Sequence, residues 1–146
     1  SIYQWCEEHF LTLNVQKTQE LIFDPRAVGD HSPLVIHNQL IAQADSYKYL
    51  GLIIDSKLSW IAQVDYVCNR VQQRLHFLRR LRAFGVSQKV MLLFYRAVIE
   101  SIVRYGISAW FCNLSVQMKA KLTCLTQRAM KLMGVKQAPL TSDHLQ

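Results

Sequence analysis

The period of the hydrophobic pattern changes after Trp60, and this change limits the possible folds more than any other feature of the chain. Downstream of it, apolar side chains recur every three to four residues over three stretches, about 61–83, 87–104 and 115–133. This spacing gathers apolar side chains on one face of a helix. Gly85 and Gly134 follow the first and third stretches, and glycine often ends a helix. We therefore predict a bundle of three helices over residues 61–134.

The middle stretch differs from its neighbours because it is apolar nearly all round. Its polar exceptions are Arg96, Glu100 and Arg104, which recur every four residues and can form one ion-paired ladder. We predict that this helix is the central and most buried of the three. Ser87 and Ser115 precede the second and third stretches and are candidate N-caps.

Shorter elements are predicted upstream of the bundle. They are a helix over 2–13, a strand over 21–23, a hairpin joining 34–36 to 40–42, and a strand over 47–55. Gly51 lies inside the last of these and predicts a bulge or the close approach of another backbone. The predicted fold class is α+β: a small antiparallel sheet with an N-terminal helix, followed by a basic three-helix bundle. We predict three parts, residues 1–60, the bundle over 61–134, and a polar tail over 135–146.

Charge is unevenly distributed between the two halves of the chain. Residues 1–60 carry four Lys and Arg against seven Asp and Glu, whereas residues 61–146 carry thirteen against three. A strongly basic segment is typical of proteins that bind nucleic acid. A basic surface that touches only solvent, or an acidic protein, is the alternative.

Composition excludes several classes of protein. The chain is 51% hydrophobic and 18% charged, so it can bury a core and is not disordered. No apolar run approaches the roughly 20 residues of a membrane span, so we predict no membrane partner. The chain begins at Ser1 without a targeting signal, and we expect it to be a fragment.

The four cysteines, Cys6, Cys68, Cys112 and Cys124, lie far apart and without metal-ligand spacing. We predict that they are core residues of an intracellular protein in a reducing compartment, with nucleus or cytoplasm left open. The sequence also holds no nucleophile motif, no phosphate-binding glycine loop and no cluster of carboxylates. We therefore predict no metal and no cofactor in this chain, and no polymerase activity from it alone.

Two short motifs occur in the order and at the spacing found in one known protein family. L-x-L-N-x-x-K-T occupies residues 11–18, and K-Y-L-G occupies residues 48–51. A basic helical segment with Tyr105-Gly106 and Trp110 follows. Together these features resemble the downstream part of the reverse transcriptase, an RNA-directed DNA polymerase, of non-LTR (LINE-type) retrotransposons.

The resemblance implies a role for each part of the chain. Residues 1–24 would be the end of the palm, Tyr49, Leu50 and Gly51 the primer grip, and the bundle the thumb. Lys17 matches a lysine near the incoming nucleotide, where a cation could stabilise the leaving group; a surface lysine is the alternative. The family's aspartate pair has no counterpart here, and a complete polymerase would need Mg.

A thumb holds its template and primer through phosphates, which requires cations on rigid helices. The candidates for this role are Arg70, Arg74, Arg79, Arg80, Arg82, Lys119, Lys121 and Lys131. We expect them to form one continuous surface that binds an RNA–DNA hybrid or another nucleic acid nonspecifically. Gly51 would let the strand approach the primer backbone because it lacks a Cβ.

A second resemblance covers residues 110–134, which are similar to a segment from the N-terminal region of an alkylated-DNA-repair AlkB homologue. The oxygenase chemistry of that family needs an HxD…H iron site, and the chain contains no HxD. The alternatives to a reverse-transcriptase fragment are therefore an AlkB-homologue segment, associated with methyltransferase or 2-oxoglutarate oxygenase repair, and a non-catalytic basic interaction module. The oligomeric state is left open.

Overall fold

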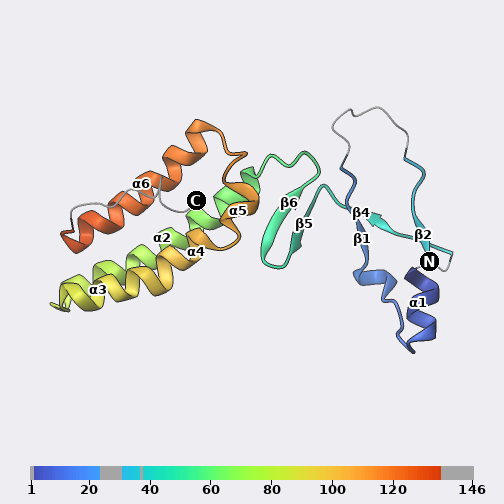
Figure 1. The fold of residues 1–146 in the computed structure, drawn as a ribbon, viewed down its shortest axis with the longest axis horizontal. Coiled ribbons are helices and arrows are strands. Elements are labelled where there is room, and N and C mark those ends of the chain that lie inside the picture. Colours follow the sequence, from blue (N-terminus) through green and yellow to red (C-terminus); the bar gives the residue numbers. More distant parts are fainter. Residues whose placement is uncertain (1, 24–30, 37, 136–146) are drawn as a thin grey trace.

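The computed structural model describes residues 2–23, 31–36 and 38–135. Figure 1 shows a helical part at one end of the molecule and a smaller part with short strands at the other. The predicted α+β fold class is confirmed. The predicted tail lies outside the described residues except for Val135, and the predicted division near residue 60 stays a prediction.

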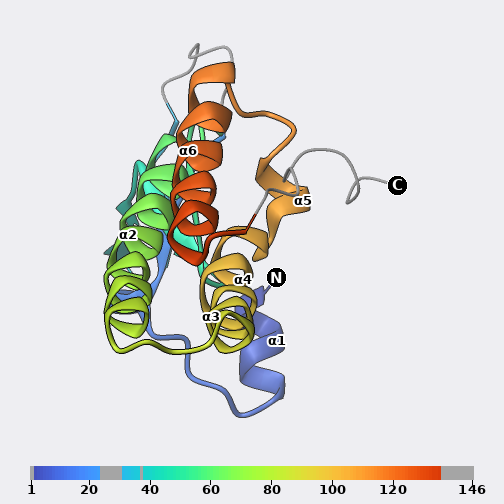
Figure 2. The same cartoon turned by 90° about the vertical axis from the view of Figure 1, so that its left-hand side faces the viewer.

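Three long helical segments make up the bundle, as predicted. They are α2 (Ile61–Ala83), a continuous segment formed by α3 (Gln88–Phe94), η2 (Tyr95–Glu100) and α4 (Ser101–Arg104), and α6 (Val116–Met133). The short helix α5 (Ile107–Trp110) lies between the last two. Figure 2, turned by 90°, shows the three long segments side by side. The predicted ranges are correct to within a residue at each end.

The predicted caps are confirmed in part. The Ser115 hydroxyl accepts a hydrogen bond from the Met118 amide and so satisfies one free N–H at the start of α6. Gly134 ends α6 in the left-handed conformation, with φ 68°. Ser87 occupies the N-cap position of α3, but its side chain makes no capping hydrogen bond.

The prediction that the middle helix is central is wrong, because α2 takes that place. α2 contacts α3, η2, α4, α6 and the strand β6 (Leu52–Asp55), and it buries seven side chains. The middle segment has only one side against α2 and leaves Val90 and Leu93 48% and 67% exposed. A helix that has apolar residues on nearly every side is therefore not necessarily buried on every side. Of the predicted ladder, the structure shows the Glu100–Arg104 ion pair, at 2.8 Å.

One hydrophobic core joins the helices. Its buried members include Trp60, Val71, Leu78, Ile99 and Trp110, and Leu52 and Ile54 of β6 pack against it. The core thus extends from the bundle to the strand that precedes it.

The predicted single strand over 47–55 is a hairpin instead. β5 (Ser46–Tyr49) pairs antiparallel with β6, and Tyr49 lies opposite Leu52. Leu50 and Gly51 form the turn, both with positive φ, 47° and 85°. Positive φ at both central residues matches the twist of paired strands. Gly51 is therefore a turn residue and not a bulge inside a strand.

The remaining elements are short. They are α1 (Ile2–Glu8), η1 (Val15–Lys17), β1 (Gln19–Glu20), β2 (Val35–Ile36), β3 (Gln39–Leu40) and β4 (Ala42–Gln43). α1 ends five residues before the predicted end, and Phe10 follows with φ 55°. The prediction of a strand over 21–23 is wrong, because these residues lie outside any strand. β1 precedes them, and it pairs with β4 in parallel rather than antiparallel. The predicted hairpin is confirmed by the antiparallel pairing of β2 with β3.

The predicted burial of all four cysteines is correct for two of them. Cys6 and Cys68 are buried, whereas Cys112 and Cys124 are exposed. Burial raises the pKa of the Cys68 thiol. The predicted compartment stays a prediction.

Candidate nucleic-acid interface

One flank of α2 carries cations and aromatic rings in alternation. We call this set the arginine–aromatic stripe; its members are Lys48, Tyr66, Arg70, Arg74, Phe77, Arg80 and Phe84. From Tyr66 onward they follow one another at steps of three or four residues, which places them on one face of the helix. Tyr66 and Arg74 are half-buried, and Tyr66 packs against the core, whereas the other members are exposed and available to a ligand.

Each arginine of the stripe lies over a ring. The guanidinium carbon of Arg70 lies 5.8 Å from the centre of the Tyr66 ring, and those of Arg74 and Arg80 lie 5.8 Å from the rings of Phe77 and Phe84. Such contacts stabilise exposed sites by about 0.5–1 kcal/mol and restrict the guanidinium groups. The stripe therefore presents positive charge that is partly oriented before any ligand arrives.

Lys48 joins the stripe from β5. Its Nζ lies 4.6 Å from the centre of the Tyr66 ring and donates a hydrogen bond to the Tyr66 hydroxyl oxygen at 3.3 Å. This hydrogen bond is the main cause that lowers the pKa of Tyr66. Burial opposes it, and the charges of Arg70 and Lys48 lower the pKa further. The hairpin thus adds one cation to the arginine–aromatic stripe of α2.

The junction between β6 and α2 holds the hairpin in place. The Asp55 carboxylate accepts hydrogen bonds from the amides of Lys57, Ser59 and Trp60 and from the Ser59 hydroxyl, at 3.0–3.1 Å. Burial raises the pKa of Asp55, but these four hydrogen bonds outweigh burial and lower it overall. In addition, Gln63 of α2 accepts a hydrogen bond from the Ile53 amide at 2.9 Å. Asp55 is therefore a structural residue, and it positions Lys48 beside α2.

The predicted primer-grip residues lie at the tip of the hairpin. Tyr49 and Leu50 are 58% and 72% exposed. The space beside Gly51 is taken by Tyr105, because a Cβ on Gly51 would lie 3.2 Å from the Tyr105 ring. The Tyr105 hydroxyl donates to the Leu50 carbonyl at 2.5 Å. The close approach predicted for a primer is thus made by this protein's own side chain, while Tyr49 and Leu50 remain open to a ligand.

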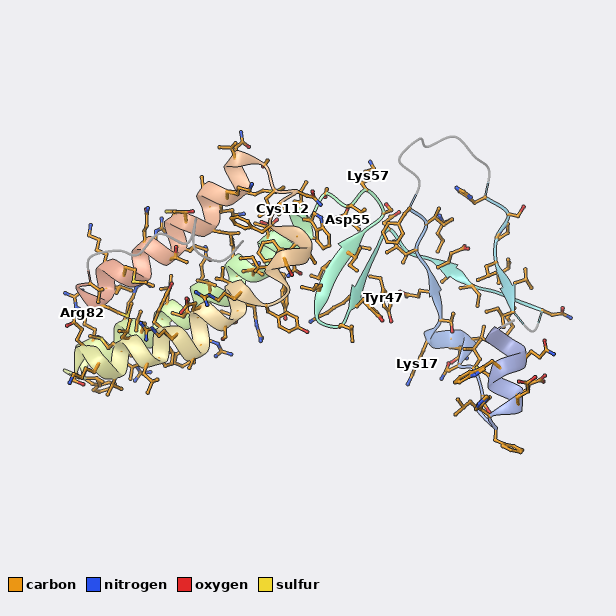
Figure 3. The ribbon with its side chains drawn as sticks, viewed as in Figure 1. Lys17, Tyr47, Asp55, Lys57, Arg82 and Cys112 are labelled. Atoms are coloured by element: carbon orange, nitrogen blue, oxygen red, sulfur yellow. The ribbon has the colours of Figure 1, made fainter. Side chains whose placement is uncertain are left out.

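The other predicted cations do not join the stripe, so the expectation of one continuous surface is wrong. Arg79 follows Arg70 by nine residues, which places it about 180° away around the helix. There it lines a pocket with Arg82 and Lys131. Figure 3 labels Arg82 at the end of the molecule farthest from Lys17.

Lys119 and Lys121 each have a local partner instead. The Lys119 Nζ lies 5.1 Å from the centre of the Phe111 ring. Lys121 donates to the Asp65 carboxylate at 2.5 Å, and this hydrogen bond raises the pKa of Lys121. Both members of the Lys121–Asp65 pair are about half exposed, so the pair adds little stability.

Lys17 lies apart from all the other candidates. It is the last residue of η1, where the Asn14 side chain accepts a hydrogen bond from the Lys17 amide at 3.2 Å. Its side chain is exposed, and Figure 3 places it beside α1. Its role near a nucleotide stays a prediction.

Several residues of the stripe and of the Arg79 pocket were not identified as site residues from the sequence. They are Lys48, Tyr66, Phe77, Phe84 and Arg128. For the aromatic residues a signal exists, because each lies three or four positions from an arginine of the same helix. Lys48 reaches Tyr66 only because the hairpin folds against α2, and no local pattern shows this.

Metal-binding clusters and membrane-spanning helices are both absent from the described ranges. No group of three or more His, Cys, Asp and Glu side chains there could hold a metal ion. No helix there is both long enough and apolar enough to cross a membrane.

Comparison with known proteins shows that the chain is similar to a transposon polymerase. Over 109 residues the chain is 27% identical to "Probable RNA-directed DNA polymerase from transposon BS" of Drosophila melanogaster. A distant relative of this chain is a transposon reverse transcriptase. The match covers 73% of this chain and spans 12% of the polymerase. The predicted resemblance to such enzymes is confirmed.

A family model adds a second similarity. The model for "Alkylated DNA repair protein alkB homolog 8, N-terminal" matches residues 60–101, which include α2 and α3. The predicted resemblance to this family is confirmed. Its predicted place, residues 110–134, is wrong, because the match lies upstream and does not overlap it. No solved structure matches the chain.

Proposed function

We propose that this chain holds the template–primer nucleic acid of a transposon-type reverse transcriptase through the phosphate backbone. The observation that carries the proposal is the arginine–aromatic stripe, with its cations held over rings at helical spacing. The similarity to a transposon RNA-directed DNA polymerase supports the same assignment. In this role residues 61–134 act as the thumb of a LINE-type enzyme, and Tyr49 and Leu50 act as its primer grip.

The geometry of α2 suits a backbone rather than base edges. A helix rises 1.5 Å per residue, so Arg70, Arg74 and Arg80 extend over about 15 Å of the helix axis. Cations on a rigid rod contact successive phosphates and carry no sequence information. Exposed rings such as Phe84, 73% exposed, offer surfaces on which unpaired bases can stack. We therefore expect nonspecific binding of an RNA–DNA hybrid, with a preference for hybrids that carry a single-stranded template overhang.

The proposed role is positioning and not chemistry. Nucleotidyl transfer requires carboxylates that hold two divalent ions. We assign that step to other parts of a complete polymerase and assign the grip on its substrate to this chain. Lys17 would act on the leaving group only within such a complete enzyme.

The test is a titration of the chain with a fluorescent RNA–DNA hybrid at several salt concentrations. The test variant is Arg70→Gln/Arg74→Gln, and the control is Lys89→Gln/Arg96→Gln on the exposed surface of the middle helix. Both remove two charges. We expect the test variant to bind at least tenfold more weakly at low salt and to reduce the slope of log K against log salt by about 2. The control should change affinity less than threefold.

Two outcomes would contradict the proposal. Equal losses in both variants would mean that only net charge matters, and the stripe would have no special role. Absence of binding at low salt would reject nucleic acid as the ligand and favour a basic module that binds an acidic protein.

A further inference from the structure

A second group of cations meets at the far end of the bundle, away from the stripe. Arg79 and Arg82 of α2 and Arg128 and Lys131 of α6 line a pocket of about 260 Å³, together with Leu132. The members of each pair are three residues apart, so each helix places two long cationic side chains beside the same space. Their hydrocarbon stems and Leu132 form most of the wall of the pocket.

The direction of the two helices brings these pairs together. Figure 1 shows α2 and α6 running in the same direction, so that both C-terminal ends lie at one end of the molecule. The Asp65–Lys121 pair joins the two helices nearer their starts. The pocket is therefore part of the seam between two packed helices and does not depend on a loop.

Helix dipoles explain only part of this cluster. The negative C-terminal end of a helix favours cations in its last turn, where Arg82 and Lys131 lie. Arg79 and Arg128 lie about one turn earlier, where the effect is weak. Within the described part of the chain, none of the four cations forms an ion pair with a carboxylate. Four like charges around one space repel one another, and a bound anion would remove that cost.

We propose that this pocket binds a phosphate group. Guanidinium groups present planar, paired N–H donors that match the oxygens of phosphate, and three of the four cations are arginines. A water molecule takes about 30 Å³, so the pocket accepts a group several times larger. Phosphate chemistry has two sources here: a free compact phosphate such as diphosphate, or a backbone phosphate of a nucleic-acid strand. This site lies outside the stripe, and its assignment does not depend on the proposed function.

The test uses inorganic diphosphate titrated into the complete chain by calorimetry at low salt. The test variant is Arg79→Gln/Arg128→Gln, which takes one cation from each helix, and the control is Arg70→Gln/Arg74→Gln in the stripe. We expect saturable binding with one site per chain, a loss of affinity of tenfold or more in the test variant, and less than a twofold change in the control. Arg128→Lys keeps the charge and removes the planar donors, so it should lose affinity without losing the fold, which circular dichroism checks.

Non-saturable binding, or equal losses in the test and control variants, would overturn the phosphate site. A competition experiment then assigns the source. If diphosphate displaces a bound RNA–DNA hybrid, the pocket holds a backbone phosphate; if both bind together, it holds a free phosphate. The control variant separates this site from the proposed function, because it should lose the hybrid and keep diphosphate.

Discussion

Burial of apolar side chains differs between residues 46–135 and residues 2–45. The first region contains all seventeen buried members of the hydrophobic core. Among the described residues of the second, Cys6 and Ile41 are the buried apolar side chains, whereas Trp5, Phe10 and Leu40 are 51%, 98% and 70% exposed. The two regions therefore differ in what holds them together, although both contain regular elements.

The difference explains the lengths of their elements. α2 has 23 residues and α6 has 18, and each is stabilised by the face that it buries. In the described part of residues 2–45, every strand has two residues, and α1 has seven. Isolated elements of that size are marginal in water. We infer that the fold of this chain depends on residues 46–135, with hairpin β5–β6 included.

Tryptophan truncation gives the largest expected contrast between the regions. Trp110 is fully buried and donates from Nε1 to the Tyr105 carbonyl at 3.2 Å. Trp110→Ala should lower the free energy of unfolding by about 3–5 kcal/mol, because it leaves a large cavity. Trp5→Ala removes the same side chain from an exposed site stacked on His9, at 4.4 Å between ring centres, and should cost less than about 1 kcal/mol. Urea unfolding followed by circular dichroism measures both. Equal losses would show that the two regions are packed alike.

The Asp55 junction gives the next largest effect. Asp55→Ala removes an acceptor of four hydrogen bonds and should destabilise the fold by about 2–3 kcal/mol. Asp55→Asn keeps the shape and should cost less. A loss below about 0.5 kcal/mol for Asp55→Ala would show that the hairpin belongs energetically with residues 2–45.

The same carboxylate predicts a pH dependence with a definite sign. Its pKa in the folded chain lies below the ordinary value, so the folded state binds the proton less readily than the unfolded chain does. Its stabilising contribution is complete above the unfolded pKa of about 3.9 and is lost as the pH falls through the folded pKa. Unfolding measured between pH 7 and pH 3 should therefore show a smaller acid loss in Asp55→Asn than in the parent chain.

The same contrast explains which parts of the fold could be predicted from sequence. The helices of the bundle were predicted correctly because a buried face imposes a 3.6-residue period on the sequence. The hairpin was predicted as one strand because its turn, Leu50-Gly51, lacks the Asn-Gly or Asp-Gly signal of such turns. α1 was predicted too long because the apolar spacing continues to Leu13, although the chain has no core there to cover it.

The candidate site was predicted only where one helix contains the whole pattern. The arginines of α2 were identified from charge, and their aromatic neighbours could have been found from the same spacing. The pocket needs α2 and α6 to run in parallel, and Lys48 needs the hairpin to pack on α2. Both depend on contacts between elements, and the hydrophobic periodicity within one segment does not predict such contacts.

Two glycines at helix boundaries provide a smaller contrast inside residues 46–135. Gly106 and Gly85 both have positive φ, 61° and 70°. A Cβ on Gly106 would lie 2.8 Å from a methyl group of Leu52 in β6, whereas a Cβ on Gly85 would meet nothing within 4 Å. Gly85→Ala should cost about 1 kcal/mol from backbone strain alone, and Gly106→Ala about 1.5–2 kcal/mol because Leu52 must move. Thermal unfolding of the two variants measures the difference. Equal costs would mean that the hairpin yields freely and is not fixed against the helices.

The smallest expected effect concerns Phe10, the most exposed large apolar side chain among the described residues. Phe10 is 98% exposed and adopts the left-handed conformation, which asparagine tolerates better than phenylalanine. Phe10→Asn should therefore change the free energy of unfolding by less than about 0.5 kcal/mol, with stabilisation as the expected sign. Urea unfolding of the complete chain, with Phe10→Ala as the control for loss of the ring alone, measures this. A loss above about 1 kcal/mol in both variants would mean that Phe10 is covered in solution. Residues 2–45 would then carry a share of the core, and the contrast between the two regions would fail.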